Sequence, residues 1–123
     1  MKNITIFGDY KTPNIYMSYD ENLYKLSGKS IPENASFVYD QILDYLKNIQ
    51  MMPQKDSVFD IDLEYYNSPT SKYLMYMFDI LNNSKNKYTI NWYYEDFDED
   101  MLESGEDYQA LFKNISFNIV LKY

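Results

Sequence analysis

The pattern of apolar and polar positions changes its period within the segment from Val58 to Leu81. Over residues 58 to 66, apolar and acidic side chains alternate, as in a strand with one buried face. The apolar side of this strand carries Phe59, Ile61, Leu63 and Tyr65, and the polar side carries Asp60, Asp62 and Glu64. Further along, the apolar positions are Leu74, Met77, Phe78 and Leu81. Their spacing is that of an amphipathic helix, so the segment predicts a strand, Val58–Tyr66, and then a helix, Thr70–Asn82.

The residues between this strand and helix favour a capped helix start. We expect Ser68 to be the N-cap and Pro69 the first helical residue, where a missing N–H costs nothing. The unpaired N–H groups and the dipole of a helix start favour anions. A hydroxyl here is a place where a phosphate could be attached and tolerated, although capping alone accounts for most serines at such positions.

The rest of the chain continues the alternation of strands and helices. Further strands are predicted at Ile4–Phe7, Ile15–Tyr19, Leu23–Ser27 and Tyr88–Tyr94, and as a last strand alternating Ile115, Phe117, Ile119 and Leu121. A hairpin turn is expected at Asp20–Asn22 and a loop at Gly28–Asn34, with Asn34 as the cap of a helix and a third helix over Asp98–Phe112. The order strand, helix, strand predicts that Val58–Tyr66 and Tyr88–Tyr94 are parallel neighbours with a right-handed crossover.

The acidic side of the central strand carries information on the architecture. A strand covered by helices on both faces is apolar throughout, whereas Asp60, Asp62 and Glu64 require water or a partner on one face. With 123 residues the chain has about the length of one domain. The expected fold is therefore a single α/β domain over residues 1–123, with a mixed sheet and helices mainly on one face.

Composition excludes several classes of function. The chain has no cysteine, histidine or arginine, so thiol nucleophiles, histidine bases and bidentate arginine forks are absent, which disfavours an enzyme. A net charge of −8 without a basic stripe argues against nucleic acid as a partner. No apolar run is long enough to cross a membrane and no signal peptide is recognisable, so we expect a cytoplasmic protein that binds no membrane.

The acidic run from Glu95 to Asp100 was tested as a calcium loop. Counted from Asp96, the EF-hand glycine and glutamate positions fall on Met101 and Asp107, so the pattern fails. Acidic residues at a helix start, where the dipole favours them, explain the run better. We therefore expect no metal site and no cofactor.

Four short motifs, in the same order, resemble those of the SiaC family of bacterial regulatory phosphoproteins. They are an early Thr12-Pro13, the segment from Leu26 to Asn34 (LSGKSIPEN), the segment from Tyr65 to Lys72 (YYNSPTSK), and Ile90–Tyr94 followed by Asp98–Asp107 (DEDMLESGED). The resemblance implies a STAS-like α/β fold, related to anti-sigma-factor antagonists, and no catalytic activity.

The resemblance also implies a phosphorylation switch. In this family a serine/threonine kinase of the anti-sigma (SiaB) type modifies the residue after the motif asparagine, and a PP2C-type phosphatase reverses the reaction. The unphosphorylated form activates a GGDEF diguanylate cyclase, which controls cyclic-di-GMP and biofilm behaviour. Carried over by position, the asparagine is Asn67 and the acceptor is Ser68, with Thr70 and Ser71 as alternatives and Lys72 one turn on. The sequence departs from the family pattern in having serine for threonine, followed by proline.

A function of another class remains open from the residues. The chain has 15 tyrosines, and an aromatic-rich open face could form a small-molecule-binding module. A closed pocket lined by tyrosines would favour that alternative.

Overall fold

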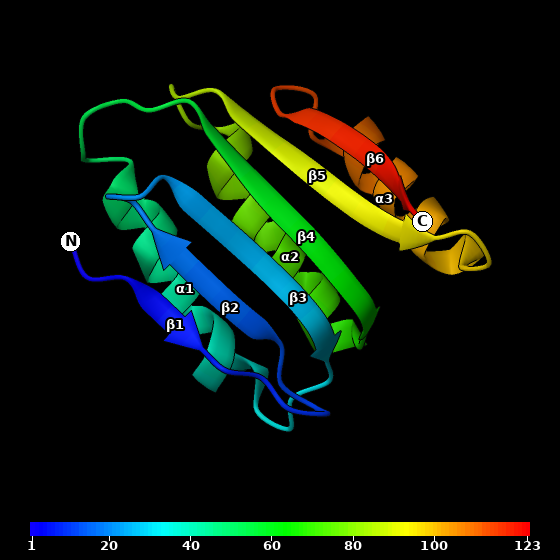
Figure 1. Cartoon of the computed structure of the whole chain (residues 1–123). Coiled ribbons are helices and arrows are strands. Elements are labelled where there is room, and N and C mark those ends of the chain that lie inside the picture. The colour runs from blue at the N-terminus through cyan, green and yellow to red at the C-terminus, as the bar shows by residue number, and fades with distance from the viewer.

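Six strands and three helices make up the computed structural model, which describes all residues from 1 to 123 (Figure 1). In chain order they are β1 (Ile4–Ile6), β2 (Asn14–Ser18), β3 (Leu23–Ser30), α1 (Ala35–Ile49), β4 (Ser57–Tyr66), α2 (Ser68–Asn82), β5 (Tyr88–Glu95), α3 (Glu99–Leu111) and β6 (Ser116–Lys122). The predicted strands and helices all exist, and most of their ends differ from the prediction by one or two residues.

The strands lie side by side in the order of the sequence. The strands β1, β2 and β3 are antiparallel to their neighbours, whereas β3, β4, β5 and β6 are parallel. Each parallel step carries one helix and moves in the same direction across the sheet, so right-handed crossovers place α1, α2 and α3 on the same face (Figure 1). The predicted mixed sheet, the parallel neighbours β4 and β5, and the one-sided helices are confirmed.

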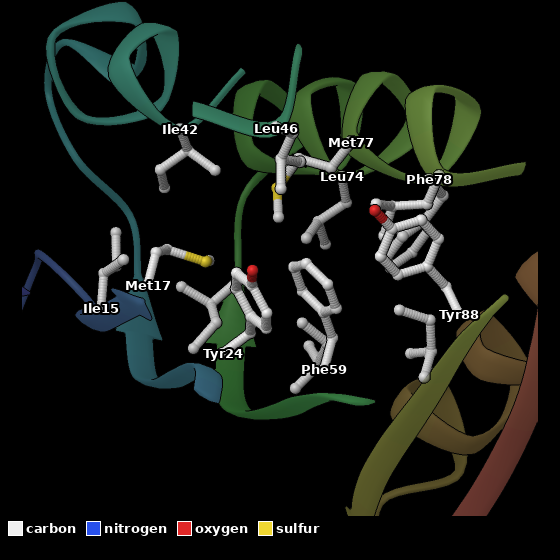
Figure 2. Close-up of a cluster of buried hydrophobic side chains, with 14 of the residues drawn as sticks. Ile15, Met17, Tyr24, Ile42, Leu46, Phe59, Leu74, Met77, Phe78 and Tyr88 are labelled. Atoms are coloured by element: carbon white, nitrogen blue, oxygen red, sulfur yellow. The ribbon is translucent and has the colours of Figure 1, made fainter. Parts of the chain in front are cut away.

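The hydrophobic core lies between this face of the sheet and the helices. In Figure 2, side chains from β2, β3 and β4 meet Ile42 and Leu46 of α1 and Leu74 of α2. The rings of Tyr24 and Phe59 stack with their centroids 4.3 Å apart, which ties β3 to β4. These contacts hold α1 and α2 against the sheet.

The other face of the sheet is polar and carries no helix. Asp60 and Asp62 are partly exposed and Glu64 is exposed. Asn91 of β5 donates a hydrogen bond to Asp60 at 3.0 Å, and Lys122 of β6 pairs with Asp62 at 2.9 Å. The prediction of one open face on the central strand is confirmed.

A change of register corrects two details of the predicted strands. The strand β3 continues to Ser30, so Gly28 and Lys29 belong to a strand and not to a loop. Gly28 has a positive φ of 88°, and there the pairing with β4 shifts by one residue. The alternation of β4 is thereby interrupted. Tyr65, predicted on the apolar side, is 58% exposed, and Tyr66 instead meets the ring of Trp92 at 6.0 Å.

Helix α3 packs against β5 at Gly105. Trp92 is fully buried, and its indole N–H donates to the carbonyl of Met101 at 2.9 Å. A Cβ built on Gly105 would lie 2.5 Å from Cδ1 of that indole. Trp92 is thus a core residue, and Gly105 marks the close approach of α3 to β5.

Gly105→Ala is expected to lower the free energy of unfolding by about 1–2 kcal/mol, because the cost of overpacking exceeds the roughly 1 kcal/mol that alanine gains in a helix. Urea denaturation measures the change. Glu106→Ala, at the exposed neighbouring position, is the control and should stay within about 0.5 kcal/mol of the wild type. A Gly105→Ala protein more stable than the wild type would contradict the packing described here.

Candidate functional site at the start of α2

The first turn of α2 follows the carboxyl end of β4 directly. Asn67 is the N-cap, and its side-chain oxygen accepts a hydrogen bond from the N–H of Thr70 at 3.1 Å. Ser68 and Pro69 are the first two helical residues, so the prediction of Ser68 as the cap is wrong by one position. Asparagine caps as well as serine, and the N–H of Asn67 donates to the carbonyl of Ser30 at 3.1 Å, which holds Asn67 outside the helix.

The hydroxyl of Ser68 is consequently free of a structural role. Ser68 is exposed, and its hydroxyl makes no hydrogen bond to another group of the chain. The side chain of Lys72, one turn further along α2, is also exposed. A reagent in solution therefore has access to this serine without any opening of the helix.

Thr70 lies on the opposite, buried side of the same turn. It has no exposed surface, and its hydroxyl donates to the carbonyl of Ser30 at 3.0 Å. The Ser30 hydroxyl lies 2.8 Å from that of Thr70 and 2.6 Å from that of Tyr39 in α1. Burial raises the pKa of the Tyr39 phenol to about 12, so it remains a neutral hydrogen-bonding group. This buried hydroxyl network joins α2 to β3 and α1.

The third hydroxyl of the turn, that of Ser71, is intermediate in exposure between those of Ser68 and Thr70. Ser71 is partly buried, and its oxygen lies 3.1 Å from the hydroxyl of Tyr108 in α3. Modification of Thr70 would require the first turn to open, and modification of Ser71 would break the contact with α3. Of the three candidate acceptors, only Ser68 is both exposed and unengaged.

A groove of about 330 Å³ lies beside Ser68, between the starts of α2 and α3. Its lining is mostly polar and includes the carboxylates of Glu64, Asp98 and Asp100. The side chain of Asp98 caps α3 by accepting from the N–H of Met101 at 3.0 Å. The groove is a surface feature and not the closed, tyrosine-lined pocket that the small-molecule alternative requires.

The groove is poorly suited to holding a phosphate of its own. Pro69 has no N–H, and the N–H of Thr70 is already taken by the Asn67 side chain. The carboxylates of Glu64, Asp98 and Asp100 would repel a phosphate. The carboxylates of the groove therefore disfavour an anion within it.

The sequence patterns did not point to Ser30 or Tyr39, nor to the groove residues Glu64 and Asp98 as neighbours of Ser68. Ser30 meets Thr70 across 40 positions of sequence, and no local pattern reports such a contact. The structure also brings no three histidine, cysteine, aspartate or glutamate side chains together as a metal site. None of the helices is both long and apolar enough to pass through a bilayer.

Comparison with known proteins gives the family. The model of the family described as "SiaC family regulatory phosphoprotein" matches residues 6–122. The chain belongs to this family. A relative, an uncharacterized protein of Pseudomonas aeruginosa (strain UCBPP-PA14), is 24% identical over 112 residues, covering 89% of each chain.

Solved structures of SiaC from Pseudomonas aeruginosa share the fold of this SiaC family protein. Apo-SiaC superimposes with a TM-score of 0.85 at 22% identity, covering 100% of both chains. SiaC in a crystal structure with the diguanylate cyclase SiaD, of which it is the activator, gives a TM-score of 0.84 at 23% identity. That match covers 96% of this chain and 97% of that chain. The α/β arrangement described above is thus that of SiaC.

The cap geometry predicts different losses of stability for substitutions at the adjacent positions 67 and 68. Asn67→Ala should lower the free energy of unfolding by about 1 kcal/mol, because the N–H of Thr70 loses its acceptor. Ser68→Ala should change it by less than about 0.5 kcal/mol, because that hydroxyl makes no contact. Chemical denaturation of both variants measures the difference. Equal destabilisation by the two substitutions would contradict Asn67 as the cap.

Proposed function

We propose that this SiaC family member is a non-enzymatic regulator whose binding to a partner protein is controlled by phosphorylation of Ser68. The observation that carries the proposal is the contrast within one helical turn. Ser68 is exposed and unengaged, whereas the hydroxyl of Thr70 is buried in hydrogen bonds and that of Ser71 lies against Tyr108. A kinase can reach Ser68 while the fold stays intact.

The proposed partners follow from the family. A serine/threonine kinase of the anti-sigma type adds the phosphate in the cytoplasm, and a PP2C-type phosphatase removes it. The regulated partner is a GGDEF diguanylate cyclase, so the output is the level of cyclic-di-GMP. The similarity to SiaC, which forms a complex with the cyclase SiaD, supports this choice of partner.

The electrostatics of the groove support a release mechanism. Phosphorylation adds close to two negative charges beside the carboxylates of Glu64, Asp98 and Asp100. A partner that covers Ser68 must then remove water from a dianion and hold it near other negative charges, which is costly. The unphosphorylated form is accordingly the one that binds the cyclase, and phosphorylation separates the two proteins.

Labelling by the cognate kinase tests the acceptor. Ser68→Ala should abolish incorporation of phosphate, whereas Thr70→Val and Ser71→Ala should retain it, provided that circular dichroism shows each variant to be folded. Thr70→Val is the matched buried control because it keeps the shape of the side chain. Mass spectrometry of the labelled wild type should place the phosphate on the peptide that contains Ser68. Undiminished labelling of Ser68→Ala would refute the assignment.

Binding to the cyclase tests the switch itself. Titration of the cyclase with the unphosphorylated protein should give a complex, and the enzymatically phosphorylated protein should bind at least about tenfold more weakly, a difference of about 1.4 kcal/mol. The Ser68→Ala protein, after the same treatment with kinase and ATP, should bind as the untreated wild type does. Equal binding of both wild-type forms would contradict a switch at Ser68.

A further inference from the structure

Exposed aromatic side chains are concentrated at one edge of the sheet. The aromatic residues with large exposed surface at this edge are Phe7, Tyr10, Phe37, Tyr65, Phe97 and Tyr123, and Tyr76 in the middle of α2 is the exception. Phe7 is 90% exposed and Phe97 is 83% exposed, so neither ring contributes to the core. Apolar rings in water are unfavourable, and these rings are spread along the width of the sheet, where a partner could cover several of them together.

The topology explains why these rings share an edge. The strands β3 to β6 are parallel, so their carboxyl ends meet at one side of the sheet (Figure 1). Tyr65 is the last residue but one of β4, Phe97 lies between β5 and α3, and Tyr123 follows β6. Phe37 is in the first turn of α1, which starts from the end of β3. The loop with Phe7 and Tyr10 joins them, because the N–H of Ile31 donates to the carbonyl of Lys11 at 2.8 Å.

Negative charge surrounds the rings nearest to Ser68. Glu64 precedes Tyr65, and Phe97 lies between Asp96 and Asp98. Glu64, Asp98 and Asp100 also line the groove beside Ser68. Of the nearby lysines, Lys122 is already paired with Asp62 and with Glu95, at 2.9 and 3.4 Å, and Lys72 is exposed and makes no ion pair with these carboxylates. The surface therefore combines apolar rings with carboxylates that have no basic partner within the chain.

We infer that this aromatic edge, defined by Phe7, Phe37, Tyr65 and Phe97, is the docking surface for a partner segment that presents apolar side chains flanked by lysine or arginine. Large rings supply the apolar contact that dominates binding energy, and complementary charge directs and orients the partner. A second copy of this chain fits poorly, since two edges of the same negative charge would meet.

This inference rests on the proposed function, because Ser68 lies within the same edge. In the unphosphorylated complex the cations of the partner balance the carboxylates of the groove. A phosphate on Ser68 adds two charges that have no counterpart in the closed interface. The same surface therefore contains the phosphorylation site and determines which charges the partner must carry.

Three synthetic peptides test the surface on the full, isotope-labelled chain by NMR titration. The first is an amphipathic helix of leucine and lysine, the second has glutamate for each lysine, and the third has the first composition in scrambled order without an apolar face. We expect only the first to bind and to shift the amide signals of residues 7–10, 64–68 and 96–100. Binding by the glutamate peptide, equal binding by the scrambled peptide, or shifts confined to the middle of the open face, at residues such as Asp60 and Asn91, would overturn the inference.

Matched variants sharpen the test. Phe97→Ser and Glu64→Lys should each weaken binding of the first peptide at least about fivefold. Met51→Ser and Asp44→Lys, which alter equally exposed side chains away from this edge, should bind as the wild type does. Unchanged binding by both edge variants would refute the surface, as would a concentration-dependent dimer of the free protein that Phe97→Ser abolishes. Kinase labelling of Ser68 in the same variants is the independent readout. If the wild-type protein does not bind the first peptide but is still labelled on Ser68 and still released from the cyclase, only this inference fails. The proposed function then stands.

Discussion

The handedness of the three crossovers is the constraint on which the rest of this molecule depends. Because each step from β3 to β6 is right-handed and moves in the same direction, all three helices cover one face of the sheet. The same geometry brings the starts of α1, α2 and α3 to one edge, at the carboxyl ends of the parallel strands (Figure 1). The groove, the exposed rings and Ser68 share that edge because the strands that lead to them are parallel.

The end of β3 then fixes how Ser68 is presented. The carbonyl of Ser30 accepts from the N–H of Asn67 and from the hydroxyl of Thr70, and the Ser30 hydroxyl lies close to that of Tyr39. Buried polar groups are costly unless they are paired, and here each has a partner. The network orients the first turn so that Thr70 faces inward and Ser68 faces outward. Two hydroxyls two positions apart thereby acquire different accessibility.

A regulator of this kind needs a modification that alters its surface and spares its core. At the start of α2 the cap is supplied by Asn67, so the hydroxyl of Ser68 carries no structural load. The groove beside it is lined by the carboxylates of Glu64, Asp98 and Asp100, so the phosphate proposed on Ser68 would alter the outer surface. The neighbouring rings of Tyr65 and Phe97 are exposed and belong to the surface inferred to dock a partner. In the proposed switch, Asn67 stabilises the helix start and Ser68 carries the modification, so the two roles fall on different residues.

The sequence by itself determined the elements, their order, the parallel pairing of β4 with β5, and the sidedness of the helices. These follow from local periodicity and from the acidic face of β4, because the polarity of each side chain is known from its own residue type. The motif that contains Ser68 was likewise visible in the sequence.

Only the tertiary structure decided the cap, the register and the surroundings of Ser68. Ser68 and Asn67 are both good caps. Asn67 is the cap because its N–H donates to the carbonyl of Ser30, in a strand far away in sequence. The position of Tyr65 depended on a register shift opposite Gly28, which lies in another strand. The separation of Ser68 from Thr70 and the meeting of the aromatic rings at one edge have the same origin. The energy of a contact between distant segments depends on both partners. The pattern of residues along one segment does not contain that information.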